Sequence, residues 1–282
     1  MRDVPDGTPL VLLHPLGGDV FAYRHVVDAL PSDRAIYAVF DGHTDVASAT
    51  TWPDPQQMID TYADEVAKTL DGRACHLAGW SLGGLLAHAT AAALQQRGVT
   101  VRSVTMWDSG VAAITAERAP APDWPAGALA VLTSLAPATG PACGPEDLRE
   151  LTARLTGHDG RGVAREAGRW ISTTAARLWP GVPTPGAEAL GARAVVAALH
   201  RWLFSAWRPP LVDAPLQVTW AGDSLDRGLV TRTDWARFTR DTVRTDRVEA
   251  THFSIIGPPA AAQLASALAT TIDLHNTADG TR

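Results

Sequence analysis

Residues 75–84 read Cys-His-Leu-Ala-Gly-Trp-Ser-Leu-Gly-Gly, and this segment is the most informative part of the sequence. It joins an apolar, strand-like run, Cys75–Ala78, to a helix-like run, Leu85–Leu94. A Gly-x-Ser-x-Gly sequence between a strand and a helix is typical of a sharp turn with a strained serine backbone. Such a turn holds the serine hydroxyl exposed at the carboxyl edge of a parallel sheet. The sequence therefore predicts that Ser81 is a nucleophile.

Strand-like and helix-like stretches alternate through most of the remaining chain. Short apolar or β-branched runs predict strands, and apolar residues at a helical period predict helices. The expected strands are Leu10–Leu13, Ala35–Phe40, Ala74–Ala78, Val101–Trp107, Leu216–Trp220 and Arg247–Ala250, and the expected helices include Val20–Leu30, Pro55–Leu70 and Pro259–Leu274. This alternation predicts an α/β fold with a mostly parallel sheet flanked by helices.

The regular alternation is interrupted between residues 111 and 210. This stretch is rich in alanine and proline, reads as several helices and contains five of the ten tryptophans: Trp124, Trp170, Trp179, Trp202 and Trp207. We expect residues 1–110 and 211–275 to form the core, residues 111–210 to form a helical lid insertion, and residues 276–282 to be a disordered tail. The tryptophans either pack the lid helices or line an apolar substrate channel, and the sequence leaves both readings open.

Composition limits the classes of function. With 282 residues, 46% of them apolar, the chain is long enough for one sizeable core. The net charge is −6 without a block of lysine and arginine, which argues against a nucleic-acid partner. No apolar stretch approaches the roughly 18 residues of a membrane span, and residues 1–6 lack a signal-peptide core, so we expect a cytoplasmic protein. Cys75 and Cys143 make neither a disulfide framework nor a metal site.

A serine nucleophile requires a base, and the base requires an acid that orients it. His252 follows the last expected strand and precedes the last expected helix, which is where the chain order Ser-Asp-His of an α/β-hydrolase puts the base. The chain has nine histidines, and the others lie in or beside expected helices and strands or in polar loops. We therefore expect His252 to be the base.

Three aspartates are candidates for the acid. Asp108 ends the strand that follows the one bearing Ser81, so it should project at the same edge of the sheet. Asp223 and Asp226 come after the next core strand, which is the commoner position of the acid in hydrolases of this kind. An aspartate after a strand is most often a turn or cap residue, so the residues alone leave the three open.

An oxyanion hole requires two backbone N–H groups aimed at the developing negative charge. One should come from Leu82, which follows the nucleophile and begins a helix whose dipole adds to the effect. The other should come from the loop after the first strand. Pro15 has no N–H, so Leu16 is the candidate there, and Gly17 and Gly18 let the loop approach a substrate closely.

One stretch suggests a different function. Ala221-Gly222-Asp223-Ser224-Leu225 resembles the site at which carrier proteins receive phosphopantetheine. In a carrier protein, that serine begins a helix in a small helical bundle. Here the stretch follows an expected strand inside an α/β pattern, and this context argues against a carrier function.

Taken together, these segments resemble the terminal (type I) thioesterase domains of non-ribosomal peptide synthetases, members of the α/β-hydrolase superfamily, and their relatives on polyketide assembly lines. The residues that carry the resemblance are Pro9–Gly18, His76–Gly84, Val104–Ser109, Trp207–Leu216 and Thr251–Phe253. The resemblance is strong in the core and weak in the lid. One departure is Asp41-Gly42-His43, where such domains usually have a Pro-Gly turn.

The resemblance implies a mechanism and a partner. A carrier protein presents an acyl or peptidyl thioester on phosphopantetheine, and Ser81 takes the chain with His252 as the base. The resemblance favours Asp108 as the acid, with the Leu16 and Leu82 amides as the oxyanion hole. Water then releases an acid, or an amine or hydroxyl of the bound chain releases a macrocycle. Neither a cofactor nor a metal is implied.

Two other functions remain open. A stand-alone editing (type II) thioesterase or a small-ester serine hydrolase would use the same triad, although the lid is long for short acyl groups. A non-catalytic binding protein on a hydrolase fold often lacks a member of the triad, and none is visibly missing here.

Overall fold

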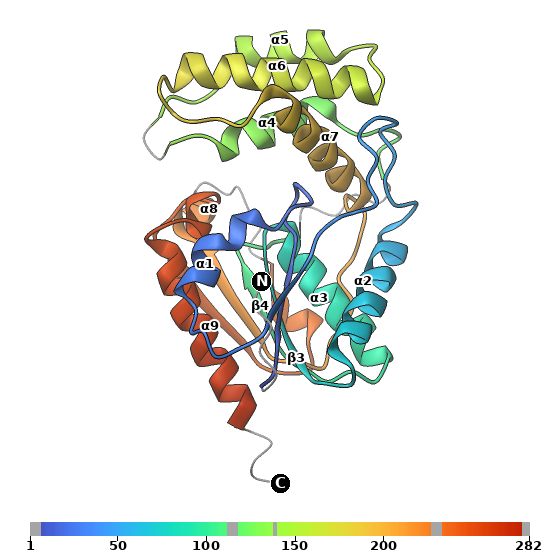
Figure 1. The fold of residues 1–282 in the computed structure, drawn as a ribbon, viewed down its shortest axis with the longest axis vertical. Coiled ribbons are helices and arrows are strands. Elements are labelled where there is room, and N and C mark those ends of the chain that lie inside the picture. The colour runs from blue at the N-terminus through green and yellow to red at the C-terminus, as the bar shows by residue number, and fades with distance from the viewer. Residues whose placement is uncertain (1–6, 112–117, 138–139, 227–232, 278–282) are drawn as a thin grey trace.

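The computed structural model describes residues 7–111, 118–137, 140–226 and 233–277. Within them, six strands form one parallel sheet in the order β2-β1-β3-β4-β5-β6 (Figure 1). The strands are β1 (Leu10–Leu13), β2 (Ile36–Val39), β3 (Cys75–Trp80), β4 (Val101–Trp107), β5 (Leu216–Ala221) and β6 (Val243–Val248). The predicted α/β fold with a mostly parallel sheet is confirmed.

Helices cover both faces of this sheet. Helices α2 (Pro55–Leu70) and α3 (Leu82–Gln96) lie on one face, and the short α1 (Arg24–Ala29) and the long α9 (Ala260–Thr277) lie on the other. Side chains of a strand alternate between the two faces. In β1, Val11 and Leu13 join the cluster beneath α2 and α3, whereas Leu10 and Leu12 join the cluster beneath α1 and α9. Two buried faces explain why the inner strands read as continuous apolar runs.

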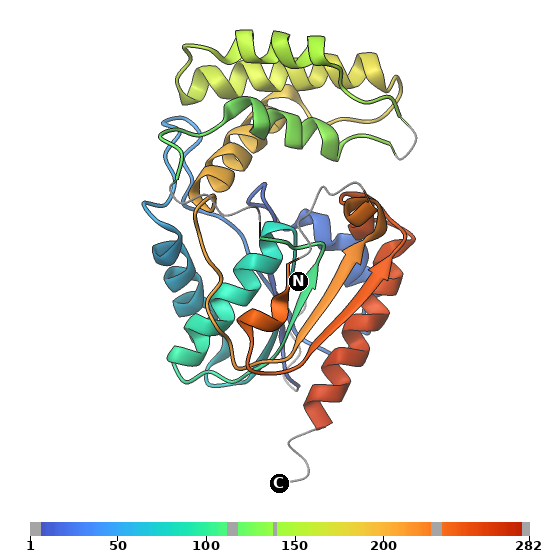
Figure 2. The ribbon, with the colours of Figure 1, turned by 180° about the vertical axis from the view of Figure 1, so that it is seen from behind.

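Four further helices form a separate layer above the carboxyl ends of the strands (Figures 1 and 2). They are α4 (Trp124–Ser134), α5 (Pro145–Leu155), α6 (Gly160–Leu178) and α7 (Ala187–Leu203), and they share a hydrophobic cluster of their own. The backbones of α6 and α7 are in direct contact at Gly168. A Cβ added there would stand only 1.9 Å from the Ala187 carbonyl oxygen, so there is no room for a side chain. We call this layer the lid; its exact boundaries, residues 111 and 210, stay a prediction.

Several expected elements differ from the structure at their ends, and the last strand and the last helix are the instructive cases. The last strand, expected at Arg247–Ala250, is Val243–Val248, because it is an edge strand whose side chains are mostly exposed and polar. The last helix continues to Thr277, past the expected end at Leu274. Asn276 lies in the helix and its Oδ1 is 3.1 Å from Nε2 of the buried His76, so the first two residues of the expected tail are ordered. Residues 278–282 lie outside the described part.

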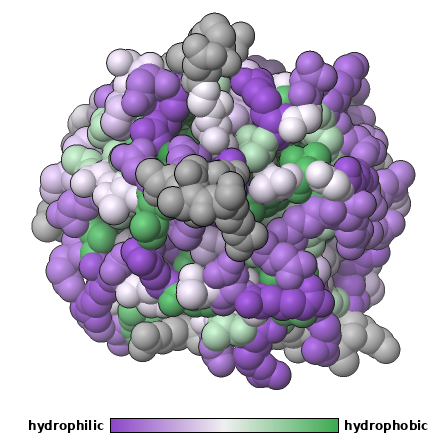
Figure 3. Space-filling view, turned by 90° about the horizontal axis from the view of Figure 1, so that it is seen from below, coloured by the Kyte–Doolittle hydropathy of each residue, from purple (hydrophilic) through white to green (hydrophobic). Residues whose placement is uncertain are grey.

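The end of the molecule opposite the lid carries mostly hydrophilic side chains, with hydrophobic ones in small separate groups (Figure 3). In the described residues, none of the helices combines the length and the apolar character that a membrane span needs. The same residues contain no group of three or more His, Cys, Asp or Glu side chains arranged to hold a metal ion.

Candidate active site

Ser81 stands on a strained turn between β3 and α3. Its φ is 58° and its ψ is −124°, a backbone conformation that residues other than glycine rarely adopt. The neighbouring glycines have no room for a side chain: a Cβ on Gly79 would lie 2.1 Å from the Gly83 carbonyl carbon, and one on Gly83 would lie 2.4 Å from the Leu13 carbonyl oxygen. The sharp turn predicted from the motif is therefore present, and glycine is sterically required on both sides of the serine.

Asp108 lies directly after β4 and is 1% exposed. Its φ of 45° turns the chain at this point. One carboxylate oxygen, Oδ1, accepts the Ala221 N–H at 3.0 Å, and the other, Oδ2, accepts the Ser224 hydroxyl at 2.6 Å. Oδ2 also lies 2.7 Å from Nδ1 of His252. These donors compensate a buried negative charge, which would otherwise be costly.

His252 links the aspartate to the serine. Its Nδ1 faces a carboxylate and therefore carries the proton, which leaves Nε2 as an acceptor 3.1 Å from Oγ of Ser81. Trp80 donates its indole N–H to the His252 carbonyl oxygen at 2.9 Å, and the two rings lie 5.1 Å apart. The imidazole is thus held by its backbone, by a packed aromatic ring and by the aspartate. The structure brings Ser81, His252 and Asp108 together in the order that nucleophilic catalysis requires.

The two alternative acids lie elsewhere. Asp226 pairs with Arg247 at the surface, with oxygen–nitrogen distances of 3.0 and 2.9 Å. Asp223 is on the short helix α8 (Gly222–Asp226), and its backbone N–H donates to the Ala250 carbonyl. Of the three aspartates, the one whose carboxylate meets the His252 ring is Asp108.

Ser224 has a position that the sequence did not reveal. In the structure, this serine of the motif resembling a carrier-protein site lies in the middle of the five-residue helix α8, where it is fully buried and donates its hydroxyl to Asp108. A buried serine whose hydroxyl already donates to a carboxylate cannot receive a phosphopantetheine without leaving the core. No local signal could have paired it with Asp108, because the two residues are 116 positions apart.

The two predicted oxyanion amides lie on the loops expected for them. Leu82 is the first residue of α3, and Leu16 lies in the loop that follows β1. Within the described part of the chain, neither N–H has a hydrogen-bond acceptor. The Tyr23 hydroxyl joins the two loops, since it donates to the Leu13 carbonyl and accepts the Trp80 N–H. An amide directly after Ser81 and a second one on the loop after β1, both without an acceptor, are compatible with an oxyanion hole, and that role remains a proposal.

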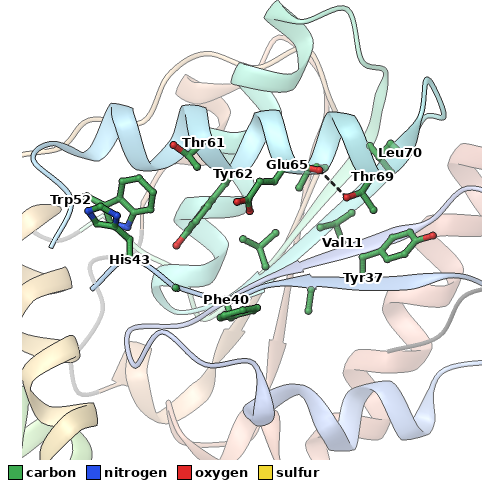
Figure 4. Close-up of a pocket in the computed structure, with 14 residues that line it drawn as sticks. Val11, Tyr37, Phe40, His43, Trp52, Thr61, Tyr62, Glu65, Thr69 and Leu70 are labelled. Carbon is green, nitrogen blue, oxygen red and sulfur yellow. Dashed lines mark hydrogen bonds between the residues drawn. The ribbon is translucent and has the colours of Figure 1, made fainter. Parts of the chain in front are cut away.

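A cavity of about 580 Å³ lies away from this triad, between α2 and the edge strand β2 (Figure 4). His43 and Trp52 stack at one end of it with ring centroids 4.1 Å apart, and Tyr37 lies at the other end (Figure 4). None of the triad residues or predicted oxyanion residues lines it. The candidate site is therefore defined by the geometry of the three side chains rather than by the size of this cavity.

The lid tryptophans divide by burial. Trp170 and Trp179 are 0% and 5% exposed and belong to the hydrophobic cluster of the lid, which confirms the packing reading for them. Trp124 packs beside the same cluster. Trp202 and Trp207 are only half-buried, near the junction of the lid and the core.

Comparison with protein families gives a match over nearly the whole chain. A family model described as a thioesterase domain matches residues 8–272. Among curated proteins, the nonribosomal peptide synthetase imqB of Aspergillus flavus is 35% identical over 103 residues, which are 36% of this chain and 3% of that protein. The orsellinic acid synthase ArmB of Armillaria ostoyae is 31% identical over 103 residues, 36% of this chain and 4% of that protein. The chain therefore spans only a small part of these relatives.

Solved structures share the fold. A four-domain nonribosomal peptide synthetase in its holo form, bound to AMP and glycine, superposes with a TM-score of 0.71 at 19% identity, over 95% of this chain and 20% of that one. The Vlm2 thioesterase domain bound with a dodecadepsipeptide gives 0.62 at 18% identity, over 93% and 92%. The NocB thioesterase domain in covalent complex with a fluorophosphonate nocardicin G analogue gives 0.59 at 20% identity, over 95% of each chain.

Proposed function

This chain belongs to the thioesterase domain family, and we propose that it releases an acyl or peptidyl chain from a carrier protein by way of an ester on Ser81. The observation that carries the proposal is the alignment of Ser81, His252 and Asp108 at the carboxyl edge of the sheet, beneath a lid of four helices. Matches to parts of multidomain synthetases support an assembly-line substrate.

The first half-reaction is acylation. Nε2 of His252 takes the hydroxyl proton as Oγ of Ser81 attacks the carbonyl carbon of the thioester. The carbonyl oxygen becomes negative, and the Leu16 and Leu82 N–H groups stabilise that charge. When the tetrahedral species collapses, the C–S bond breaks and the protonated His252 returns the proton to the departing thiol. The products are an ester on Ser81 and a free phosphopantetheine thiol on the carrier.

Asp108 acts through His252. Its carboxylate keeps the proton of the imidazole on Nδ1 and stabilises the imidazolium that forms during each transfer. The hydroxyl of Ser224 and the Ala221 N–H fix the orientation of this carboxylate. With the aspartate fixed, Nε2 points at the serine without further reorganisation.

The second half-reaction decides the product. His252 activates either a water molecule, which gives a free acid, or an amine or hydroxyl of the bound chain, which gives a macrocycle. The lid lies above the ends of the strands and would determine whether the chain folds back or water enters (Figure 1). Macrocyclisation and hydrolysis are therefore alternatives that this site supports equally. The large lid favours a long chain over the short acyl groups of an editing thioesterase.

Mass spectrometry of the intact protein tests the proposal. We expect a peptidyl thioester to leave an adduct of the peptide mass on the wild-type protein, followed by release of an acid or a macrocycle. Ser81→Ala should show no adduct, whereas the exposed Ser48→Ala serves as the control and should behave like the wild type. An adduct of unchanged size and rate in Ser81→Ala would contradict the proposal. Long peptidyl and short acyl thioesters, compared side by side, distinguish chain release from editing.

A further inference from the structure

The lid helix α7 packs directly on the loop that carries Leu16. Three of its residues, spaced as one helical face, make the contacts: Arg193, Val196 and His200. Arg193 pairs with Asp19 at 2.8 Å. Gly18, with a φ of 78°, leaves so little space that a Cβ there would lie 3.1 Å from Val196. The loop and the lid helix therefore fit each other closely.

His200 makes the innermost of these contacts. Its ring is fully buried, with Nδ1 2.9 Å from the Leu16 carbonyl oxygen and Nε2 2.9 Å from Oδ2 of Asp41. A carbonyl and a carboxylate only accept hydrogen bonds, so each ring nitrogen must carry a proton to make its contact favourable. His200 is therefore an imidazolium in this arrangement, and Asp41 is its counter-charge.

The groups around Asp41 favour the ionised form of its carboxylate. Besides His200, its carboxylate accepts the backbone N–H groups of His43 and Thr44, the Thr44 hydroxyl and the indole N–H of Trp52. Burial opposes the charge, but these hydrogen bonds and the charge of His200 hold the pKa of Asp41 well below its usual range. A buried ion pair with this many donors is costly to break, because either partner alone would leave an uncompensated charge.

His14 completes the cluster. Its ring stacks on His200 with centroids 5.2 Å apart. Burial and the charge of His200 lower the pKa of His14 to about 3, so this ring is neutral. Its Nδ1 donates to the Pro15 carbonyl at 2.8 Å, and its Nε2 accepts the Tyr62 hydroxyl at 2.8 Å.

These two histidines hold two consecutive peptide groups. The Pro15 carbonyl and the Leu16 N–H belong to one planar peptide, so the bond from His14 sets the direction of that N–H. The Leu16 carbonyl belongs to the next peptide, which His200 holds from the lid. The backbone on both sides of the Leu16 Cα is thus fixed by buried side chains, one from the core and one from α7.

We propose that Asp41 and His200 form a buried clamp that joins the lid to the oxyanion loop and makes His200 a positioning residue for the Leu16 amide. The inference rests on the proposed function in one respect, which is that the Leu16 N–H stabilises the oxyanion of the acyl-transfer reaction. It follows that the hole is complete only while α7 is docked on the loop. Any displacement of α7 must either break the ion pair or pull the loop away from Ser81.

Two substitutions at one position separate the two bonds of His200. The amide nitrogen of asparagine can take the place of Nδ1, so His200→Asn keeps a donor for the Leu16 carbonyl and loses the bond to Asp41. The amide nitrogen of glutamine can take the place of Nε2, so His200→Gln keeps the bond to Asp41 and loses the one to Leu16. The readout is the rate at which a small fluorophosphonate modifies Ser81, because this reagent requires the serine and the oxyanion amides but neither carrier nor peptide.

We expect His200→Gln to slow the modification by about 10- to 100-fold, somewhat less than the loss of a whole oxyanion donor. His200→Asn should stay within about fivefold of the wild type after correction for the folded fraction. Arg193→Gln is the matched control, since it removes another contact between α7 and the loop without touching Leu16, and it should stay within about twofold. Equal losses in the two His200 variants, in proportion to their loss of thermal stability, would show a structural role alone and overturn the clamp.

Nitrogen-15 spectra of the histidine-labelled protein give a second, independent readout. With the contacts to the Leu16 carbonyl and Asp41 intact, both nitrogens of His200 should carry a proton, while His14 shows one protonated nitrogen. A neutral His200 would overturn the ion pair. If instead both readouts support the clamp but no peptidyl thioester acylates Ser81, the proposed substrate class fails and the clamp stands.

Discussion

The carboxyl edge of the sheet and the lid above it are organised by different means. At the edge, the backbone positions the candidate catalytic side chains: Ser81 and Asp108 have φ values of 58° and 45°, and glycines around the serine leave no room for side chains beside neighbouring backbone atoms. In the lid, four helices pack on a hydrophobic cluster of their own, with Trp170 fully buried at its centre. The lid meets the edge through side chains, and the innermost contact is the pair of Asp41 and His200.

This difference teaches that the two regions should fail in different ways. If the proposed function holds, a change at the edge should displace the candidate catalytic groups and remove activity while the protein stays folded. A change inside the lid should remove hydrophobic packing and lower stability, whereas a change where the lid faces the sheet edge should alter which nucleophile reaches the proposed ester on Ser81. Substitutions in each region test this difference.

The largest effect is expected at the edge, from Asp108→Asn. The side chain keeps its size but presents an amide to Nδ1 of His252, which favours the wrong tautomer and lowers turnover by up to about 10⁴-fold. Asp226→Asn is the matched control, because this carboxylate pairs with Arg247 at the surface and should change turnover less than about threefold. Steady-state kinetics with one thioester, together with thermal unfolding of both variants, measures the contrast. Similar losses in the two variants would remove Asp108 from the triad.

The next effect is expected inside the lid. Trp170→Ala should cost about 3–5 kcal/mol of unfolding free energy, because it empties a large volume at the centre of the cluster. Trp170→Phe should cost only about 1–2 kcal/mol, since the indole N–H has no acceptor among the described residues and most of the volume is retained. Denaturant titration gives both values. A Trp170→Ala protein as stable as the wild type would mean that the lid is not held together by this cluster.

The difference between the sheet edge and the lid also explains which features could be predicted from the sequence. The turn around Ser81 depends on residues within three positions of it, so a short motif predicts both the strand-turn-helix and the nucleophile. Helix α2 has the predicted bounds because its apolar residues recur at a helical period, and strand β4 has them because it is a short run with β-branched residues that is buried almost throughout. Strand β6 differs from its predicted bounds, because an edge strand needs few apolar side chains.

Neither the choice among the three aspartates nor the pairing of Asp41 with His200 could be predicted from local sequence. Asp108, Asp223 and Asp226 each follow a strand, and only the three-dimensional arrangement shows which carboxylate reaches His252. Asp41 and His200 are 159 positions apart, and the sequence marks Asp41 only as a departure from a usual turn. Pairings across such distances depend on how a lid packs on a core, and single-chain patterns do not encode that packing in a readable form.

A smaller effect is expected from acid. His88 is buried in the core, and burial lowers its pKa from 6.5 to about 4, against the bond of its Nε2 to the Phe238 carbonyl. Between pH 6.5 and pH 4 the unfolded chain binds more protons at His88 than the folded chain does. The contribution of His88 to the unfolding free energy is therefore fully present above pH 6.5 and decreases as the pH falls towards 4. A buried histidine with a lowered pKa, such as His88, changes the unfolding free energy by up to about 1.4 kcal/mol per pH unit in this range.

His88→Gln keeps an N–H for the Phe238 carbonyl and removes the titration, so the unfolding free energy should depend less steeply on pH between 6 and 4.5. The exposed lid residue His158 provides the control, and His158→Gln should leave the slope unchanged. Urea unfolding at a series of pH values measures both. If the slope of His88→Gln equals that of the wild type, the acid sensitivity comes from other groups.

The smallest effect in free energy is expected near the junction of the lid and the core, at Trp202. This half-buried residue near the end of α7 stacks beneath the Arg118 guanidinium, 4.1 Å from the ring centroid, and donates its indole N–H to the Ala119 carbonyl at 2.6 Å. Unlike Trp170, it leaves part of its ring accessible, so the ring can contact a bound chain. Trp202→Ala should cost about 1 kcal/mol of stability or less and leave the modification of Ser81 within about twofold. It should also either change the ratio of acid to macrocycle or raise KM for a long peptidyl thioester by about tenfold. A tenfold rise in KM corresponds to the loss of about 1.4 kcal/mol of contact energy.

The control variant Trp202→Phe retains an aromatic surface and loses only the bond to Ala119, so it should keep the wild-type product ratio. Product analysis by mass spectrometry distinguishes these results, and a Trp202→Ala protein with wild-type products and KM would assign this ring to packing, like Trp170.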